Sequence, residues 1–126
     1  TYPEAEEMFR RMVFNVLATN YDDHTKNFSF MLKQNESWAL SPAYDLCFAF
    51  DEKNHWVNKQ TLSVNGKRLH ITKADLMTIA KANSIKKGAQ IVEHINAVVK
   101  SWGEYANQAM LREELKNRIK MNLNTF

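Results

Sequence analysis

The sequence contains little glycine and no glycine-rich motif. Its 126 residues include three glycines, at positions 66, 88 and 103, and each stands alone. A phosphate-binding loop of the form G-x-x-x-x-G-K-[ST] needs clustered glycines, and so does a G-x-G-x-x-G loop. This stretch of chain therefore contains no glycine-rich loop of its own that could enclose the phosphates of a nucleotide.

Cysteine and long apolar runs are equally scarce. The single Cys47 excludes an internal disulfide and a cysteine-based zinc site, and we interpret it as a small core residue. No apolar run approaches the roughly 18 residues of a membrane span, and no signal peptide is evident. We therefore expect a soluble, cytoplasmic protein with no membrane partner. The net charge of +3 is too small and too widely spread to identify a partner.

Apolar residues at helical spacing predict four helices, and 44% of the residues are hydrophobic, which is enough for a core. The first helix is expected over Pro3–Ala18, with Arg10 and Arg11 outside its apolar face. Thr72 and Asp75 form an acidic capping box, so a second helix begins there and ends near Asn83. Two more are expected over 86–102, ended by Gly103, and over 104–121.

Two short apolar runs predict a β-hairpin between the first two helices. Phe28–Leu32 and Trp38–Leu40 flank a polar connection of five residues, and we expect both strands to pack on the first helix. A second, shorter hairpin is expected around Asn65-Gly66. The fold class is thus mainly α, or α+β with a small sheet.

Three oxygen-bearing side chains lie around this hairpin at informative spacing. Asp22 and Asn27 stand five residues apart before it, and Asp45 follows it in the segment Ser-Pro-Ala-Tyr-Asp. Protein kinases use an Asp to accept the proton of the substrate hydroxyl, an Asn five residues later to bind magnesium, and a second Asp to bind the metal at the phosphates. Hard oxygen ligands of this kind suit Mg²⁺.

Two segments resemble the signature motifs of the HipA-like serine/threonine kinases, the toxins of bacterial toxin–antitoxin pairs. They are Asp22-Asp23-His24-Thr25-Lys26-Asn27-Phe28 and Ser41-Pro42-Ala43-Tyr44-Asp45-Leu46. The resemblance implies a protein-kinase-like fold in which residues 1–126 form the helical C-terminal catalytic lobe, with the hairpin carrying the catalytic loop and the metal-binding Asp. The chain starts at Thr1, so we expect a fragment whose nucleotide-clamping lobe lies upstream, and we expect the fragment alone to be inactive.

The motifs assign a role to each polar side chain, and each role has a simpler alternative. Asp22 would be the catalytic base, or else an Asx-turn residue. Lys26 would steady the transferring phosphate, or else be a surface lysine. Asn27 and Asp45 would bind Mg²⁺ and with it ATP, or else Asn27 would be a turn residue and Asp45 a loop cap after Pro42. His24 would support the loop and by resemblance line the nucleotide pocket. Asp23 is expected to be structural.

The resemblance also implies a reaction and partners. The γ-phosphate of ATP would pass to a Ser or Thr hydroxyl of a translation component such as an aminoacyl-tRNA synthetase. The binding partner would be a HipB-like helix-turn-helix antitoxin, through which DNA is bound indirectly. The chain departs from ordinary kinases because it has no H-R-D and no Gly after Asp45. The alternatives are a non-catalytic helical interaction or pseudokinase-like module, and a metal-dependent hydrolase.

Overall fold

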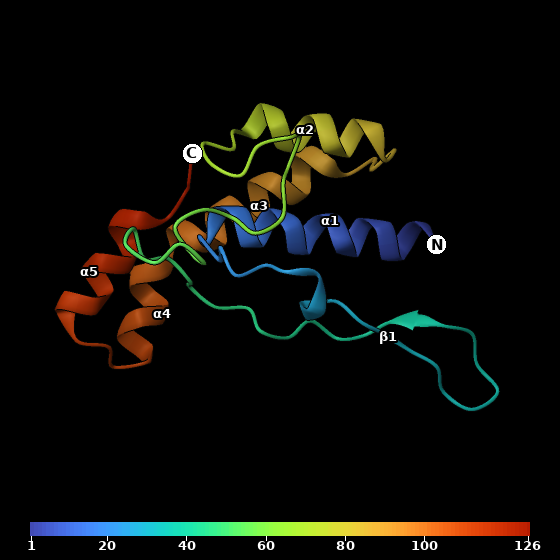
Figure 1. Ribbon diagram of the computed structural model, residues 1–126, viewed down its shortest axis with the longest axis horizontal. Helices are drawn as coiled ribbons and strands as arrows, with labels where there is room; N and C mark the ends of the chain where they lie inside the picture. The colour runs from blue at the N-terminus through green and yellow to red at the C-terminus, as the bar shows by residue number, and fades with distance from the viewer.

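Helix α1, Tyr2–Leu17, is the longest helix and lies along the middle of the molecule in the computed structural model, which describes all 126 residues (Figure 1). Pro3 occupies its first turn, where a missing N–H costs nothing. The Glu4 carboxylate accepts hydrogen bonds from the amino group and the hydroxyl of Thr1. The predicted helix over 3–18 is confirmed to within a residue at each end.

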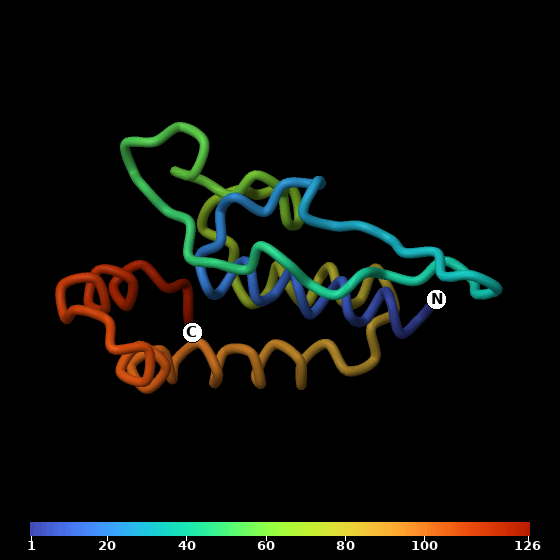
Figure 2. The backbone as a smooth tube through the Cα atoms, turned by 90° about the horizontal axis from the view of Figure 1, so that it is seen from below, coloured from blue at the N-terminus to red at the C-terminus, as the bar shows by residue number.

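Helices α2, Lys73–Ala82, and α3, Gly88–Lys100, pack with α1 around the core. Figure 2 shows α3 running beside α1 in the same direction, and α2 returns antiparallel to α3. The predicted capping box of α2 is present, because the Thr72 hydroxyl and the Asp75 carboxylate bond each other's backbone N–H groups. The core centres on fully buried aliphatic side chains from these three helices, among them Val13, Val16, Leu17, Leu76 and Val92.

The C-terminal part forms two short helices where the sequence predicts one. Helix α4 is Trp102–Gln108 and helix α5 is Glu113–Asn122. The prediction of a helix over 104–121 is wrong because Met110 adopts a left-handed conformation, with φ at 53°, which ends α4. The prediction that Gly103 ends a helix is also wrong, since Gly103 lies inside α4. None of the α-helices combines the length and the apolar character that crossing a bilayer requires.

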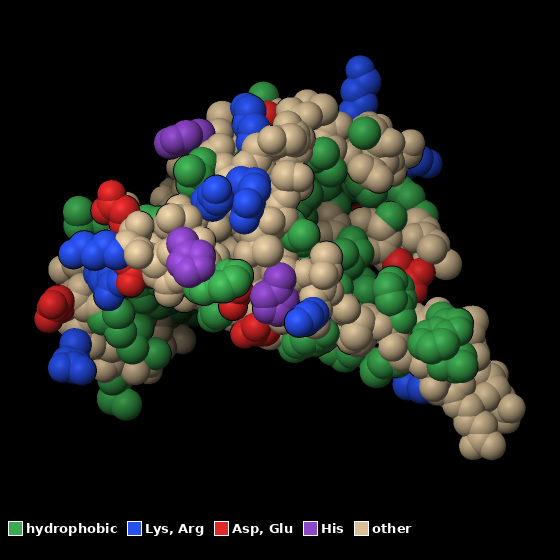
Figure 3. All heavy atoms as spheres, in the orientation of Figure 1, with side chains coloured by type: hydrophobic (Ala, Val, Ile, Leu, Met, Phe, Trp, Pro, Cys, Tyr) green, Lys and Arg blue, Asp and Glu red, His purple; other side chains and the backbone are tan.

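The predicted hairpin forms as a two-stranded antiparallel sheet of β1, Phe30–Met31, and β2, Ala39–Leu40, in which Phe30 pairs with Leu40. It projects beyond the helices near the N-terminus of α1, and hydrophobic side chains are visible on its surface (Figures 1 and 3). Phe30 is 58% exposed and Trp38 64% exposed. The prediction that both strands pack on α1 is therefore wrong, although the backbone N–H of Leu40 does reach Glu4.

The second predicted hairpin is reduced to one tight turn, which is attached to α2. Val64 and Lys67 form a single antiparallel bridge, and Asn65 and Gly66 between them have positive φ values of 51° and 75°. These values are typical of a type I′ turn. The Asn65 amide and the Lys67 ammonium both donate to Asp75, at 2.8 and 2.9 Å. One carboxylate thus caps α2 and holds the turn.

The close approach of α2 and α3 gives a test of packing. A Cβ atom on Gly88 would lie 2.6 Å from Cβ of Ala80, whereas a Cβ on Gly103 would meet nothing within 4 Å. We expect Gly88→Ala to lower the free energy of unfolding by about 1–3 kcal/mol through overpacking. Gly103→Ala is the matched control and should raise it by up to about 1 kcal/mol through helix propensity. Urea unfolding of both variants measures the difference, and equal effects would contradict the observed packing.

The Asp75 contacts predict a loss of stability in acid. Hydrogen bonds from Thr72, Asn65 and Lys67 hold the pKa of Asp75 well below its ordinary value of 3.8. The folded state therefore binds fewer protons than the unfolded state below about pH 5, so the free energy of unfolding should fall as pH decreases through this range. Thermal unfolding between pH 3 and 6 should show a shallower decline for Asp75→Asn than for the unmodified protein. Substitution of the exposed Glu36 by Gln should leave the slope unchanged.

Candidate functional site

The loop after α1 and the loop after β2 bring Asn27 and Asp45 into direct contact. A short 3₁₀ helix, η1, Thr25–Asn27, places Asn27 at its last position. The Asn27 side-chain nitrogen Nδ2 donates to Oδ2 of Asp45 at 2.9 Å and to the main-chain oxygen of Asp22 at 3.1 Å. Residues that are 18 positions apart in the chain, and whose proximity the motifs predict, therefore meet at one place.

The free oxygen atoms of this cluster are of the type that Mg²⁺ prefers. Oδ1 of Asn27, Oδ1 of Asp45 and both carboxylate oxygens of Asp22 accept no hydrogen bond within the protein. No group of three or more His, Cys, Asp or Glu side chains is arranged to hold a metal by itself. A magnesium ion takes only one or two carboxylates and relies on phosphates and water for the rest, so the donor set fits a metal that arrives with a nucleotide.

Asp22 and His24 lie together at the surface of the loop. Their side chains are 46% and 38% exposed, and Nε2 of His24 lies 3.9 Å from Oδ1 of Asp22, which is too far for a hydrogen bond. The other ring nitrogen of His24, Nδ1, is buried and makes no hydrogen bond. The Asp22 carboxylate is thus accessible to a substrate, as a catalytic base requires, and no residue blocks it by direct hydrogen bonding.

Lys26 contributes its backbone to the cluster more clearly than its side chain. The Tyr44 hydroxyl donates to the main-chain oxygen of Lys26 at 2.8 Å, which ties the residue before Asp45 to the loop after α1. The Lys26 side chain is exposed and forms no ion pair in the structure. Its ammonium is therefore free to approach a phosphate.

Asp23 is a structural carboxylate, as the sequence predicts. It is 2% exposed and accepts hydrogen bonds from the Gln60 side chain at 2.8 Å and from the backbone N–H groups of Thr61 and Leu62, both at 3.0 Å. Burial raises the pKa of Asp23 because it removes water from the charged carboxylate, while the hydrogen bonds from Gln60, Leu62 and Thr61 act in the opposite direction. This residue fastens the 60–62 segment beside the candidate base.

Cys47 is exposed, so the interpretation as a small core residue is wrong. Its thiol lies 3.9 Å from the Asn20 side-chain oxygen, on the segment that follows Asp45. Partial desolvation raises the pKa of the Cys47 thiol, and the negative charges of Asp45 and Asp22 raise it further.

Sequence reasoning missed the buried polar residues that hold the two loops against α1. The Arg11 guanidinium donates to the main-chain oxygen of Ser41 at 2.8 Å, and the Asn20 amide donates to the main-chain oxygen of Asp45 at 3.2 Å and to Asn15 at 3.0 Å. The signal was present in the spacing. Glu4, Arg11 and Asn15 lie seven and four residues apart, so they share one face of the helix.

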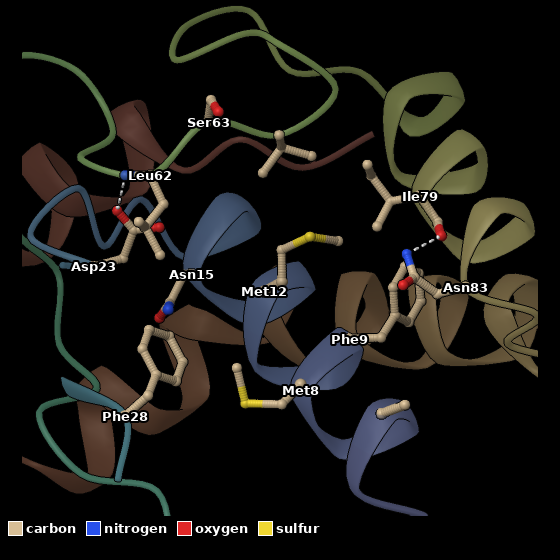
Figure 4. Close-up of a pocket in the computed structure, with 12 residues that line it drawn as sticks. Met8, Phe9, Met12, Asn15, Asp23, Phe28, Leu62, Ser63, Ile79 and Asn83 are labelled. Atoms are coloured by element: carbon tan, nitrogen blue, oxygen red, sulfur yellow. Dashed lines mark hydrogen bonds between the residues drawn. The ribbon is translucent and has the colours of Figure 1, made fainter. Parts of the chain in front are cut away.

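An apolar pocket of about 280 Å³ lies between α1, α2 and the 62–64 segment, and Asp23 is one of the residues that line it (Figure 4). Met8 and Met12 line it from α1, Ile79 lines it from α2, and Phe28 lines it from the residue after η1. Neither Asp22, Asn27 nor Asp45 contributes to it. The pocket offers no free carboxylate, since Asp23 is engaged with Leu62, so the candidate chemistry lies outside it.

The neighbouring Asp22 and Asp23 give a paired test of these assignments. Asp23→Ala would leave three donors without their acceptor and should lower the free energy of unfolding by about 2–4 kcal/mol. Asp22→Ala removes a half-exposed carboxylate without hydrogen bonds and should change the free energy of unfolding by less than about 0.5 kcal/mol. Urea unfolding at neutral pH measures both. A large loss for Asp22→Ala, or none for Asp23→Ala, would show that the two roles are wrongly divided.

Comparison with known proteins places the chain in a family. The family model described as "HipA-like C-terminal domain" matches residues 1–102. A Sinorhizobium fredii (strain NBRC 101917 / NGR234) protein named "Putative kinase Y4dM" is 46% identical over 43 residues. That match covers 34% of this chain and only 10% of the relative. No solved structure matches the chain. Because the family model covers well over half of the residues, including both predicted motifs, this chain belongs to the HipA-like C-terminal domain family.

Proposed function

We propose that this chain is the C-terminal catalytic lobe of a HipA-like serine/threonine kinase and that it transfers the γ-phosphate of ATP to a Ser or Thr hydroxyl. The observation that carries the proposal is the 2.9 Å contact between Asn27 and Asp45, with the backbone of Asp22 bonded to the same amide. A kinase needs these three residue types at one point. The family membership and the name of the relative support the same class of activity.

Each residue has a defined task in this proposal. Asp22 orients the substrate hydroxyl and accepts its proton, which its exposed carboxylate allows. Asn27 and Asp45 hold Mg²⁺, which when bound with ATP neutralises charge on the phosphates. Lys26 approaches the transferring phosphate with its unpaired ammonium. His24 borders the nucleotide beside Asp22.

The wider context follows from the family resemblance. Residues 1–126 contain no phosphate-clamping glycine loop, so the nucleotide-binding lobe belongs to another part of the full-length chain. The protein substrate is a translation component such as an aminoacyl-tRNA synthetase, and a HipB-like antitoxin restrains the activity. Residues 1–126 alone should not phosphorylate, because positioning of ATP is most of the catalysis.

Phosphoryl transfer by the full-length natural protein tests the proposal. With Mg²⁺ and γ-labelled ATP we expect autophosphorylation, and Asp22→Asn and Asp45→Asn should each reduce its rate by at least about 100-fold, because a base and a metal ligand are removed. The matched control is Glu52→Gln, which neutralises an exposed carboxylate that makes no hydrogen bond and should have no effect.

Two results would overturn the proposal. One is autophosphorylation that survives both substitutions of Asp22 and Asp45. The other is a folded full-length protein that neither binds Mg²⁺–ATP nor transfers phosphate, which would favour the pseudokinase-like interaction module.

A further inference from the structure

The main chain of Asp45 is held by a buried asparagine that none of the sequence motifs includes. Asn20 is 1% exposed, and its Nδ2 donates to the main-chain oxygen of Asp45 at 3.2 Å and to Oδ1 of Asn15 at 3.0 Å. A primary amide nitrogen carries two N–H groups, and both are used here. The orientation of the Asn20 amide is therefore determined by two acceptors on different elements, α1 and the loop after β2.

The backbone around Asn20 is itself fixed. Asn20 forms an isolated parallel bridge with Ala49, in which Tyr21 N–H bonds the oxygen of Ala49 and Ala49 N–H bonds the oxygen of Thr19. The backbone N–H of Asn20 also bonds the oxygen of Asn15. The segment after Asp45 is thus paired with the segment after α1, and Asn20 joins them by its side chain as well.

Asp45 needs such support because its backbone is unusual. Its φ is 55°, in the left-handed region that non-glycine residues rarely occupy, although Asp tolerates it better than most. Such a conformation persists where the surroundings determine it. The amide of Asn20 binds the carbonyl that follows this strained Cα, while the amide of Asn27 binds the carboxylate. Asn20 thereby holds the main chain of Asp45, and Asn27 holds its side chain.

Arg11 secures the entrance to the same loop. Its Nη2 donates to the main-chain oxygen of Ser41 at 2.8 Å, and its Nε is held by Glu7 at 2.9 Å. Arg11 thus bonds the start of the segment from Ser41 to Asp45, and Asn15 reaches the end of that segment through the Asn20 amide. The main chain of Asp45 is thereby tied through Asn20 to α1, which also leads into the loop that bears Asp22 and Asn27.

We propose that Asn20 is a positioning residue for the metal-binding function of Asp45, acting with Asn15 to hold the Asp45 backbone in its left-handed conformation. The inference rests on the proposed function, because it assigns to Asp45 the binding of a divalent cation with a nucleotide. Asn20 touches neither of these ligands. It acts only through the main chain of Asp45.

Substitution of Asn20 by Asp in the full-length natural protein tests this role. The change keeps the shape but replaces the donor nitrogen by an oxygen, which would face the oxygens of Asp45 and Asn15. We expect the Kd for Mn²⁺, measured by electron paramagnetic resonance with a non-hydrolysable ATP analogue present, to rise about 10- to 100-fold, as for loss of other groups that orient metal ligands. Asn107→Asp introduces the same charge on the exposed face of α4 and should leave this Kd unchanged.

Magnesium dependence separates a positioning role from a structural one. For Asn20→Asp, the Mg²⁺ concentration that gives half-maximal autophosphorylation should rise by the same factor, and excess Mg²⁺ should restore the maximal rate. The same excess should not rescue Asp45→Asn. A merely structural role would reduce the folded fraction but leave the metal affinity of the folded protein unchanged.

The possible outcomes distinguish the two proposals. If the unmodified protein binds Mn²⁺ with the analogue and Asn20→Asp binds it equally well, the positioning role is overturned and the kinase proposal stands. If the unmodified protein shows neither metal–nucleotide binding nor phosphoryl transfer, the kinase proposal fails, and the positioning role fails with it. Should Asn20→Asp not fold, Asn15→Ala replaces it: it removes only the second acceptor of the amide, and an unchanged Mn²⁺ affinity would overturn the role.

Discussion

The packing of α1 constrains the rest of the structure, because this one helix contacts both the hydrophobic core and the polar loops. Its apolar side chains, such as Val13 and Leu17, are fully buried among the other helices. Another face carries Glu4 and Arg11, which bond Leu40 and Ser41 at the end of the hairpin, and Asn15, which bonds the Asn20 amide that holds Asp45. A rotation or shift of α1 would disturb the core and the loop together. The hydrophobic core therefore also determines where the polar loops lie.

The polar cluster consists of few groups, each with a separate partner. Asp22 is accessible, Asp23 is buried and satisfied by three donors, and Asn27 connects the two loops. Adjacent carboxylates thus have opposite environments, so one loop contains a buried structural acid and an accessible one.

The projecting hairpin has one feature that local sequence predicts, its strand pairing, and one that it does not predict, its packing. The strand pairing follows from two apolar runs around a polar turn and was predictable. The packing of the hairpin was not predictable, because Phe30 and Trp38 are of residue types that are usually buried and yet remain largely exposed. The break between α4 and α5 is similar, since nothing in the apolar spacing around Met110 indicates its left-handed backbone. Apolar periodicity shows which side chains favour burial, but it does not show which element will cover them.

The sequence by itself determined the helices with clear caps, the tight turn at Asn65-Gly66, the structural character of Asp23, and the expectation that Asn27 and Asp45 lie together. These features depend on local backbone preferences or on short motifs of defined spacing. Only the tertiary structure decided that the Asn20 amide joins Asn15 to the backbone of Asp45, and that Arg11 is buried. Hydrogen bonds to main-chain oxygens leave no pattern in the residue types that accept them. The spacing of Arg11 and Asn15 shows that they share one helix face, but their partners can be recognised only when the elements have been packed against each other.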